Sequence, residues 1–105
     1  MDGFRADYLD LTDTPHFDDF AKKGVRSEGL KPVFTSKTFP NHYSLATGMY
    51  VENHGLIANS FFASDFDKYY SMRDRESVEN GNFYGGEPIW VTAEKQGLRQ
   101  PATFG

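Results

Sequence analysis

The 105-residue sequence contains no cysteine, which excludes disulfide bonds and thiolate metal sites. Any bound metal would therefore need Asp, Glu, His or hydroxyl ligands. The chain also lacks an excess of positive charge, because 15 acidic and 11 basic residues give a net charge of −4. No positive field would attract the phosphate backbone of a nucleic acid duplex. We therefore expect no stable duplex-binding role.

Long apolar runs are absent as well. No stretch approaches the roughly 20 residues that a membrane-spanning helix needs, and no basic-then-apolar signal segment follows Met1. The sequence thus shows neither a transmembrane segment nor a signal peptide. With 38% hydrophobic residues, a chain of this length can bury on the order of 65% of its unfolded surface, so one small domain is possible.

The two ends of the sequence suggest a fragment. Only Met1 precedes Asp2-Gly3, a pair that in a functional site normally follows a buried strand. Residues 102–105 also end within what resembles a strand. A sheet without its first strand exposes an unpaired edge. We therefore expect residues 1–105 to be part of a larger domain and to fold only marginally in isolation.

Three helices are predicted from cap residues, prolines and terminal glycines. Residues 14–24 (TPHFDDFAKKG) combine a cap residue, proline at the first helical position, early acids, late lysines and a glycine. In this helix Phe17, Phe20 and Ala21 form one apolar face. Residues 87–97 (EPIWVTAEKQG) follow the same pattern, and a third helix is expected from Pro40 to Thr47.

Extended segments are expected after two of these helices. One runs from Val25 to Phe34 and the other begins at Leu98. Each follows a glycine, Gly24 or Gly97, that can adopt a left-handed conformation. Helix-to-strand joins of this kind imply a parallel sheet with flanking helices, so the predicted fold class is α/β.

Residues 60–86, which lie between the helices expected at 40–47 and 87–97, are rich in aromatic and polar side chains. Alternation around residues 60–62 and 69–72, with DFD at 65–67 between them, predicts a hairpin or an ordered loop over the sheet. This insertion is too aromatic for a flexible linker.

Thr38 and Asp2 are the residues best suited to chemistry. Thr38 lies at the amino end of the predicted third helix, where free N–H groups and the helix dipole favour an anion such as phosphate. A threonine hydroxyl needs a metal ion or a base to act as a nucleophile, and Asp2 could supply a metal ligand. Taken singly, Thr38 would more often be a helix cap and Asp2 a turn residue. In an α/β chain, however, both would lie at the carboxyl edge of the sheet, where ligands bind.

Five segments together resemble the nucleotide pyrophosphatase/phosphodiesterase family of the alkaline phosphatase superfamily. They are residues 2–5 (DGFR), 36–43 (SKTFPNHY), 46–50 (ATGMY), 53–60 (NHGLIANS) and 85–92 (GGEPIWVT). Their order and spacing match over nearly the whole chain. Residues 94–97 (EKQG) most resemble the corresponding residues of bacterial members. The resemblance implies that residues 1–105 are the N-terminal portion of one phosphodiesterase catalytic domain.

The resemblance also implies a mechanism. Two zinc ions would lie over the sheet edge, with Asp2 a ligand of one zinc and Thr38 the nucleophile bound to it, forming a covalent phospho-threonine. Asn59 resembles the residue that hydrogen-bonds a phosphoryl oxygen, and Phe39 the aromatic on which a nucleotide base stacks. Without the motif, Asn59 would be a turn residue and Phe39 a core residue more often than not. The histidines, His16, His42 and His54, are given structural or supporting roles.

The family's other zinc ligands would lie beyond Gly105, so the isolated chain is expected to be inactive. The implied reaction of the full-length protein is cleavage of a small nucleotide pyrophosphate or phosphodiester to release nucleoside 5'-monophosphate. Choline or lysophospholipid esters remain alternative substrates, and a catalytically inactive ligand-binding relative is another alternative. A sulfatase is disfavoured because residues 38–41 (TFPN) lack the Cys or Ser and the Arg of that family. Export to the periplasm, cell surface or exterior is also implied.

Overall fold

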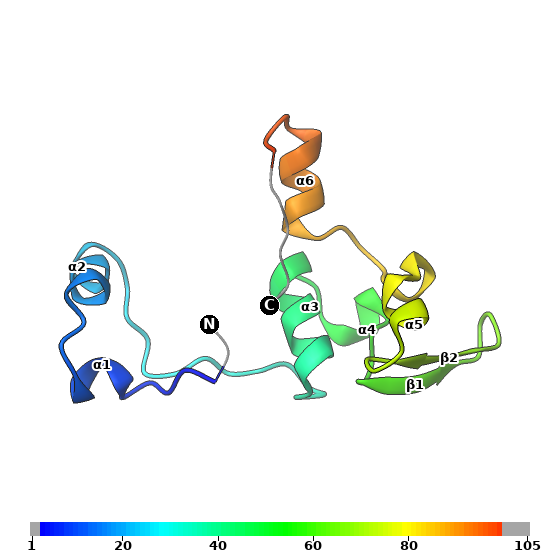
Figure 1. The fold of residues 1–105 in the computed structure, drawn as a ribbon, viewed down its shortest axis with the longest axis horizontal. Coiled ribbons are helices and arrows are strands. Elements are labelled where there is room, and N and C mark those ends of the chain that lie inside the picture. Colours follow the sequence, from blue (N-terminus) through cyan, green and yellow to red (C-terminus); the bar gives the residue numbers. More distant parts are fainter. Residues whose placement is uncertain (1–2, 100–105) are drawn as a thin grey trace. The chain divides into compact units, whose positions relative to one another are not determined.

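A computed structural model of the chain describes residues 3–99 (Figure 1). The chain divides into two compact units, Met1–Lys31 and Pro32–Gly105. No helix in the described range is long and apolar enough to cross a membrane.

The first unit contains helices α1 (Tyr8–Leu11) and α2 (Pro15–Lys23). The second helix confirms the prediction for residues 14–24, with Pro15 at its first position. The Thr14 side chain does not cap a helix N–H; its hydroxyl donates to Asp18 Oδ1 at 3.2 Å. The predicted apolar face is largely exposed, with Phe20 79% accessible, and Phe17 contacts the ring of Phe4.

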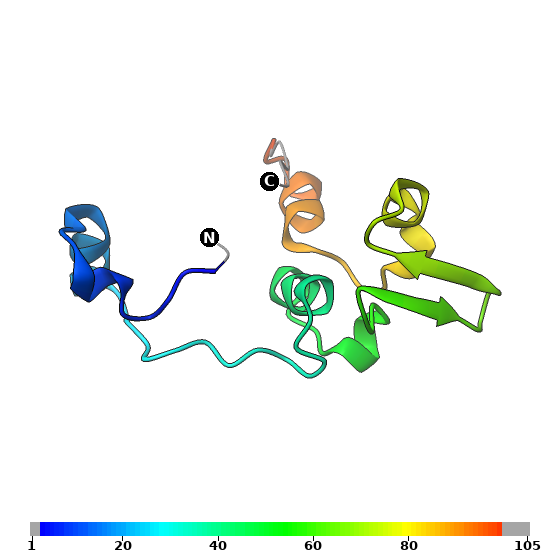
Figure 2. The same cartoon turned by 60° about the horizontal axis from the view of Figure 1, so that its bottom comes forward.

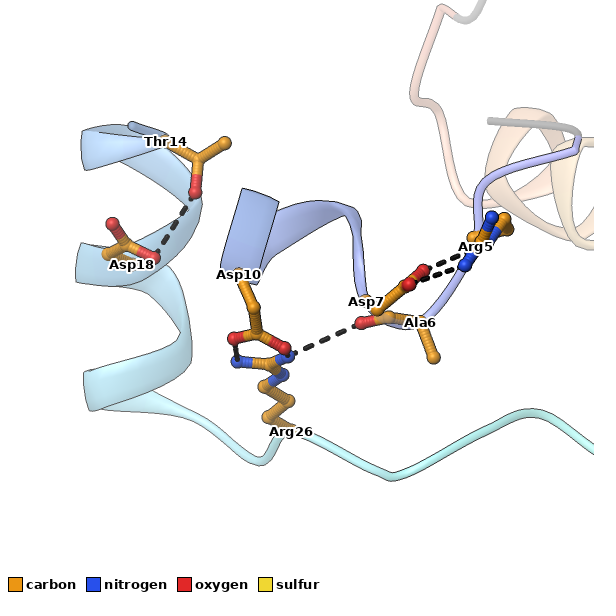
Figure 3. Close-up of polar contacts among 7 residues, drawn as sticks. All are labelled: Arg5, Ala6, Asp7, Asp10, Thr14, Asp18 and Arg26. Atoms are coloured by element: carbon orange, nitrogen blue, oxygen red, sulfur yellow. Dashed lines mark hydrogen bonds and ion pairs between the residues drawn. The ribbon is translucent and has the colours of Figure 1, made fainter. Parts of the chain in front are cut away.

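Polar side chains connect the two ends of the first unit (Figure 3). Arg26 donates two hydrogen bonds to the carboxylate of Asp10, at 3.0 and 2.7 Å, and a third to the carbonyl of Ala6 at 3.3 Å. This hydrogen bonding lowers the pKa of the exposed Asp10 carboxyl. The bidentate geometry orients the segment after α2 against α1, although solvent screening limits its contribution to stability.

The second unit contains most of the regular structure. Its elements are α3 (Thr38–Thr47), α4 (Val51–His54), β1 (Ser60–Ala63), β2 (Lys68–Ser71), α5 (Arg75–Glu79), the 3₁₀ turn η1 (Gly81–Phe83) and α6 (Ile89–Lys95). Figures 1 and 2 both show α4 between α3 and the hairpin. The third predicted helix is confirmed but begins at Thr38, two residues early, and ends at Gly48 with φ 69°.

The predicted hairpin is also confirmed. Strands β1 and β2 are antiparallel, and Phe61 faces Tyr70 while Phe62 faces Tyr69. Phe61 and Tyr70 lie on the face that contributes to the core, whereas Phe62 and Tyr69 are exposed on the other face. Successive strand side chains point to opposite faces, which accounts for the alternation seen in the sequence.

The core of the second unit is a small aromatic cluster built on Leu56, Tyr70 and Phe83. Six partly buried residues pack against it: Phe39, Tyr43, Phe61, Ala63, Val78 and Tyr84. The Tyr84 hydroxyl donates to the Val78 carbonyl at 2.9 Å, so it accepts the 3.0 Å hydrogen bond from the Tyr70 hydroxyl. The cluster therefore connects α3, the hairpin and the segment after α5.

Two expectations about strands and glycines were wrong. Residues 25–34 have no regular structure, and Val25 and Phe34 are 96% and 89% exposed. A strand exists only when its backbone pairs with a neighbour, and the described part of the chain offers this segment no partner. Gly24 is not left-handed, with φ −122°, whereas Gly97 is, with φ 83°. The strand expected after Leu98 lies mostly outside the described residues.

Candidate active site

Thr38 is the first residue of α3 and its side chain is exposed. Helix geometry leaves the N–H groups of the first turn without intrahelical acceptors. The first i to i−4 hydrogen bond of α3 runs from the Asn41 N–H to the Lys37 carbonyl, at 3.1 Å. Within residues 3–99, neither the hydroxyl nor the N–H of Thr38 hydrogen-bonds another protein group. Thr38 thus presents an accessible hydroxyl beside the positive end of a helix dipole.

Asn59 is joined directly to this helix start. Its side-chain Oδ1 accepts a hydrogen bond from the backbone N–H of Phe39 at 3.0 Å. An N–H can donate only to an acceptor, so this bond identifies the oxygen of the amide and leaves Nδ2 as a donor of two hydrogens. No acceptor among the described residues takes those hydrogens. The structure therefore brings an amide donor next to Thr38.

The backbone of Asn59 is held by the hairpin. Its carbonyl accepts a hydrogen bond from Met72 N–H at 2.8 Å, which extends the β1–β2 ladder by one step. The Ser60 hydroxyl donates to the same carbonyl at 2.9 Å. Because the hairpin also supplies Phe61 and Tyr70 to the core, the position of Asn59 depends on aromatic packing distant in sequence from Thr38.

The segment that precedes α3 is attached at two points. Asn41 Oδ1 accepts from Val33 N–H at 3.1 Å, and the Thr35 hydroxyl donates to the Ile57 carbonyl at 2.6 Å. Both bonds join residues before Thr38 to groups on α3 or on the loop that carries Asn59. These contacts define the direction from which the chain enters the helix.

Phe39, the expected stacking residue, is half-buried and packs against the aromatic core. Its ring therefore has a packing role, and its part in base stacking stays a prediction. His16 is exposed on α2, whereas His54 is buried, with 1% of its surface accessible. His54 Nε2 lies 2.8 Å from Ser44 Oγ, a pair that sequence reasoning did not identify. The two are ten positions apart in the sequence, and no periodic pattern links them.

The described residues include only part of the predicted metal site. Asp2 lies outside the described residues, so its pairing with Thr38 stays a prediction. Among residues 3–99, no group of three or more His, Cys, Asp or Glu side chains could hold a metal ion. Zinc in proteins usually has four ligands. The described residues do not supply such a set by themselves.

Comparison with known proteins shows extensive similarity. The chain is 50% identical over 104 residues to the bis(5'-adenosyl)-triphosphatase enpp4 of Mus musculus, covering 97% of this chain and 22% of that protein. It is 43% identical over 106 residues to ectonucleotide pyrophosphatase/phosphodiesterase family member 3 of Bos taurus, covering 99% and 12%. The chain thus spans about a fifth or less of the length of these relatives. Both are vertebrate proteins, so the expected bacterial type is not supported.

Solved structures show the same relationship. The structure superimposes on murine ectonucleotide pyrophosphatase/phosphodiesterase 5 with a TM-score of 0.75 and 41% identity, covering 91% of this chain and 26% of that one. An inactive variant of the murine protein in complex with AMP matches with a TM-score of 0.75, 40% identity and coverages of 92% and 26%. These matches confirm a partial α/β fold. A model of the family "Type I phosphodiesterase / nucleotide pyrophosphatase" matches residues 1–105, and the chain therefore belongs to that family.

Proposed function

We propose that this chain is the N-terminal portion of the catalytic domain of a hydrolase that cleaves nucleotide pyrophosphate or phosphodiester bonds. The proposal rests chiefly on one observation, the hydrogen bond between Asn59 Oδ1 and Phe39 N–H beside the exposed Thr38. This arrangement presents a hydroxyl nucleophile and an amide donor at one helix start. A phosphoryl group bound there would meet both.

In the proposed reaction, the Thr38 hydroxyl releases its proton to solvent and Thr38 Oγ attacks phosphorus. A new bond forms between Thr38 Oγ and phosphorus, while the bond from phosphorus to the leaving oxygen breaks and that oxygen keeps the electron pair. Water then attacks the phospho-threonine, which restores the Thr38 hydroxyl and releases nucleoside 5'-monophosphate. During both steps, Asn59 Nδ2 would donate to a non-bridging oxygen whose negative charge grows in the transition state.

Two zinc ions are proposed as cofactors of the full-length protein. Asp2 and Thr38 would hold one of them, with further ligands from outside this chain. When bound, zinc would lower the pKa of the Thr38 hydroxyl and offset charge on the phosphate. In this proposal the helix dipole and Asn59 would stabilise the phosphoryl group in addition to the metal.

A nucleotide substrate is favoured over a choline or lysophospholipid ester. The supporting finding is that an inactive variant of a murine relative of similar fold was solved with AMP. Phe39, the residue after Thr38, is proposed to contact the base. Export from the cytoplasm is proposed from the family alone. We propose no duplex nucleic acid as substrate, because the net charge is −4.

The test uses the complete protein that carries this segment and a p-nitrophenyl ester of a nucleoside 5'-monophosphate. Thr38→Ala is expected to lower kcat at least about 1000-fold, because the nucleophile is removed. Thr38→Ser retains a hydroxyl and should keep measurable turnover. Ser36→Ala, which removes a nearby exposed hydroxyl, is the matched control and should remain within about twofold of the wild type.

Two further measurements sharpen the test. Mass spectrometry of acid-quenched enzyme should find the phosphoryl adduct on Thr38, and a chelator should abolish turnover until zinc is restored. A phosphocholine ester assayed in parallel tests the alternative substrate class. Turnover that is unchanged in Thr38→Ala would refute the assignment of the nucleophile.

A further inference from the structure

The loop between α4 and the hairpin is attached to α3 at both of its ends. At one end, His54 contacts Ser44 in the middle of α3, with Nε2 and Oγ 2.8 Å apart. At the other end, Asn59 accepts from Phe39 in the first turn of α3. Phe39 and Ser44 are five positions apart in the helix, which corresponds to about 7.5 Å along the axis. Two such attachments restrict both sliding and rotation of the loop against the helix.

The hydrogen bonds of His54 define its tautomer. The backbone N–H of Leu56 donates to His54 Nδ1 at 3.1 Å, so Nδ1 carries no proton. The proton of the neutral ring therefore lies on Nε2, which donates to Ser44 Oγ. One imidazole thus bonds at the same time to α3 and to the backbone of Leu56 in the loop. A side chain with only one polar atom could not make both bonds.

The surroundings of His54 are closely packed. The ring meets Tyr43 of α3 edge-on, with centroids 5.1 Å apart, and the His54 carbonyl accepts from Gly85 N–H at 2.8 Å. Both Ser44 and His54 are buried. The titratable group that faces the His54 ring is the phenol of Tyr43. The ring of Tyr84 lies beyond it, with its centroid 5.3 Å from that of Tyr43. Buried polar groups that all find partners specify one arrangement of the elements that carry them.

We propose that the Ser44–His54 hydrogen bond positions Asn59 for phosphoryl transfer by holding the loop 54–59 in register with α3. His54 is a positioning residue in this scheme, because it acts through Asn59 and does not touch the reacting atoms. The inference rests on the proposed function of Asn59. It adds a residue pair that contributes to the rate from the interior of the domain.

The kinetic test is a double-mutant cycle in the complete protein. Ser44→Ala is expected to lower kcat about 10-fold to 100-fold with KM changed less than about twofold, because Asn59 loses its transition-state geometry. In an Asn59→Ala background, Ser44→Ala should have no further effect on kcat, since the group through which it acts is gone. Additive losses in the double variant would overturn the proposal.

Ser77→Ala is the matched control. Ser77 is as buried as Ser44, at 6% exposed, and its hydroxyl is hydrogen-bonded to the Tyr69 carbonyl and to Asp74. Its removal should reduce stability similarly and leave kcat unchanged. His54→Gln, which can direct an amide N–H toward Ser44, should recover more of the rate than His54→Ala. Ser44→Cys fills the same space with a weaker acceptor and serves as a second variant if Ser44→Ala does not fold.

A second readout is independent of activity. Hydrogen exchange at the Phe39 amide reports the bond to Asn59 directly. Ser44→Ala should accelerate this exchange about tenfold or more, and Ser77→Ala should not. Unchanged exchange at Phe39 would overturn the positioning role even in an active enzyme. Faster exchange in a protein without phosphodiesterase activity would support the linkage while refuting the proposed function.

Discussion

The side-chain oxygen of Asn59 accepts a hydrogen bond from the backbone N–H of Phe39 at 3.0 Å, so the amide nitrogen of Asn59 is left to donate beside Thr38. The oxygen and the nitrogen of this amide therefore have different tasks. The oxygen holds the residue against α3, and in the proposed reaction the nitrogen donates to a phosphoryl oxygen.

Asn59→Asp separates these two tasks. The carboxylate can still accept from Phe39 N–H, but it cannot donate and it brings negative charge toward an anionic substrate. We expect kcat to fall about 100-fold to 1000-fold, as for removal of an oxyanion donor, with exchange at the Phe39 amide still slow. Steady-state kinetics and hydrogen exchange measure the two effects. A variant with both normal turnover and slow exchange would show that Asn59 only anchors the loop.

Gly85→Ala should destabilise the protein through a steric clash. A Cβ built at Gly85 lies 2.9 Å from the His54 carbonyl oxygen, and that atom belongs to the backbone and cannot rotate away. We expect a loss of about 1–3 kcal/mol in unfolding free energy, measured by urea titration. Gly81→Ala is the control, because a Cβ there meets nothing within 4 Å. Equal effects of the two substitutions would contradict the close approach at Gly85.

The tyrosine pair in the core predicts an asymmetry. Tyr84→Phe leaves the buried Tyr70 hydroxyl without its acceptor and the Val78 carbonyl without its donor, which should cost about 1–3 kcal/mol. Tyr70→Phe removes a donor and leaves the bond from Tyr84 to Val78 intact, so the cost should be smaller, about 0.5–1.5 kcal/mol. Burial raises the pKa of Tyr70, so its hydroxyl remains protonated. Urea midpoints in the reverse order would refute these donor assignments.

His54 predicts a pH dependence of stability. Burial lowers its pKa below the ordinary value of 6.5, against smaller opposing effects of the His54 and Pro40 backbone groups. Below pH 6.5, His54 therefore binds a proton more readily in the unfolded chain than in the folded one. The stabilisation from neutral His54 is complete above about pH 6.5 and is lost as the pH falls toward the lowered pKa.

The substitution His54→Gln removes this titration. The difference in thermal midpoint between wild type and His54→Gln should be largest near pH 8 and should shrink near pH 5. Because His16 and His42 are present in both proteins, their contributions cancel in the comparison. A difference that stays constant with pH would show that His54 does not titrate differently in the folded and unfolded states.

The helices and the hairpin were largely predictable from local signals. Proline and late lysines located α2, and a left-handed glycine ended α3 at Gly48. Short elements escaped prediction, including α1, α4 and α5, because four or five residues are too few to show a period. Residues 25–34 were expected to be extended because they follow a helix and Gly24, but strand formation depends on a partner that local sequence does not encode.

The sequence by itself was enough to identify the family motifs and the candidate residues Asp2, Thr38 and Asn59. It also predicted that a helix, whose free N–H groups favour an anion, starts near Thr38. The helix start follows from local chemistry, such as the missing N–H of Pro40, whereas the role of Asn59 was implied by the family resemblance. Only the tertiary structure decided that Asn59 bonds to Phe39 and that His54 bonds to Ser44. Both bonds join residues 10 or 20 positions apart, and they form because aromatic packing brings the hairpin and α4 against α3, an arrangement that no local pattern specifies.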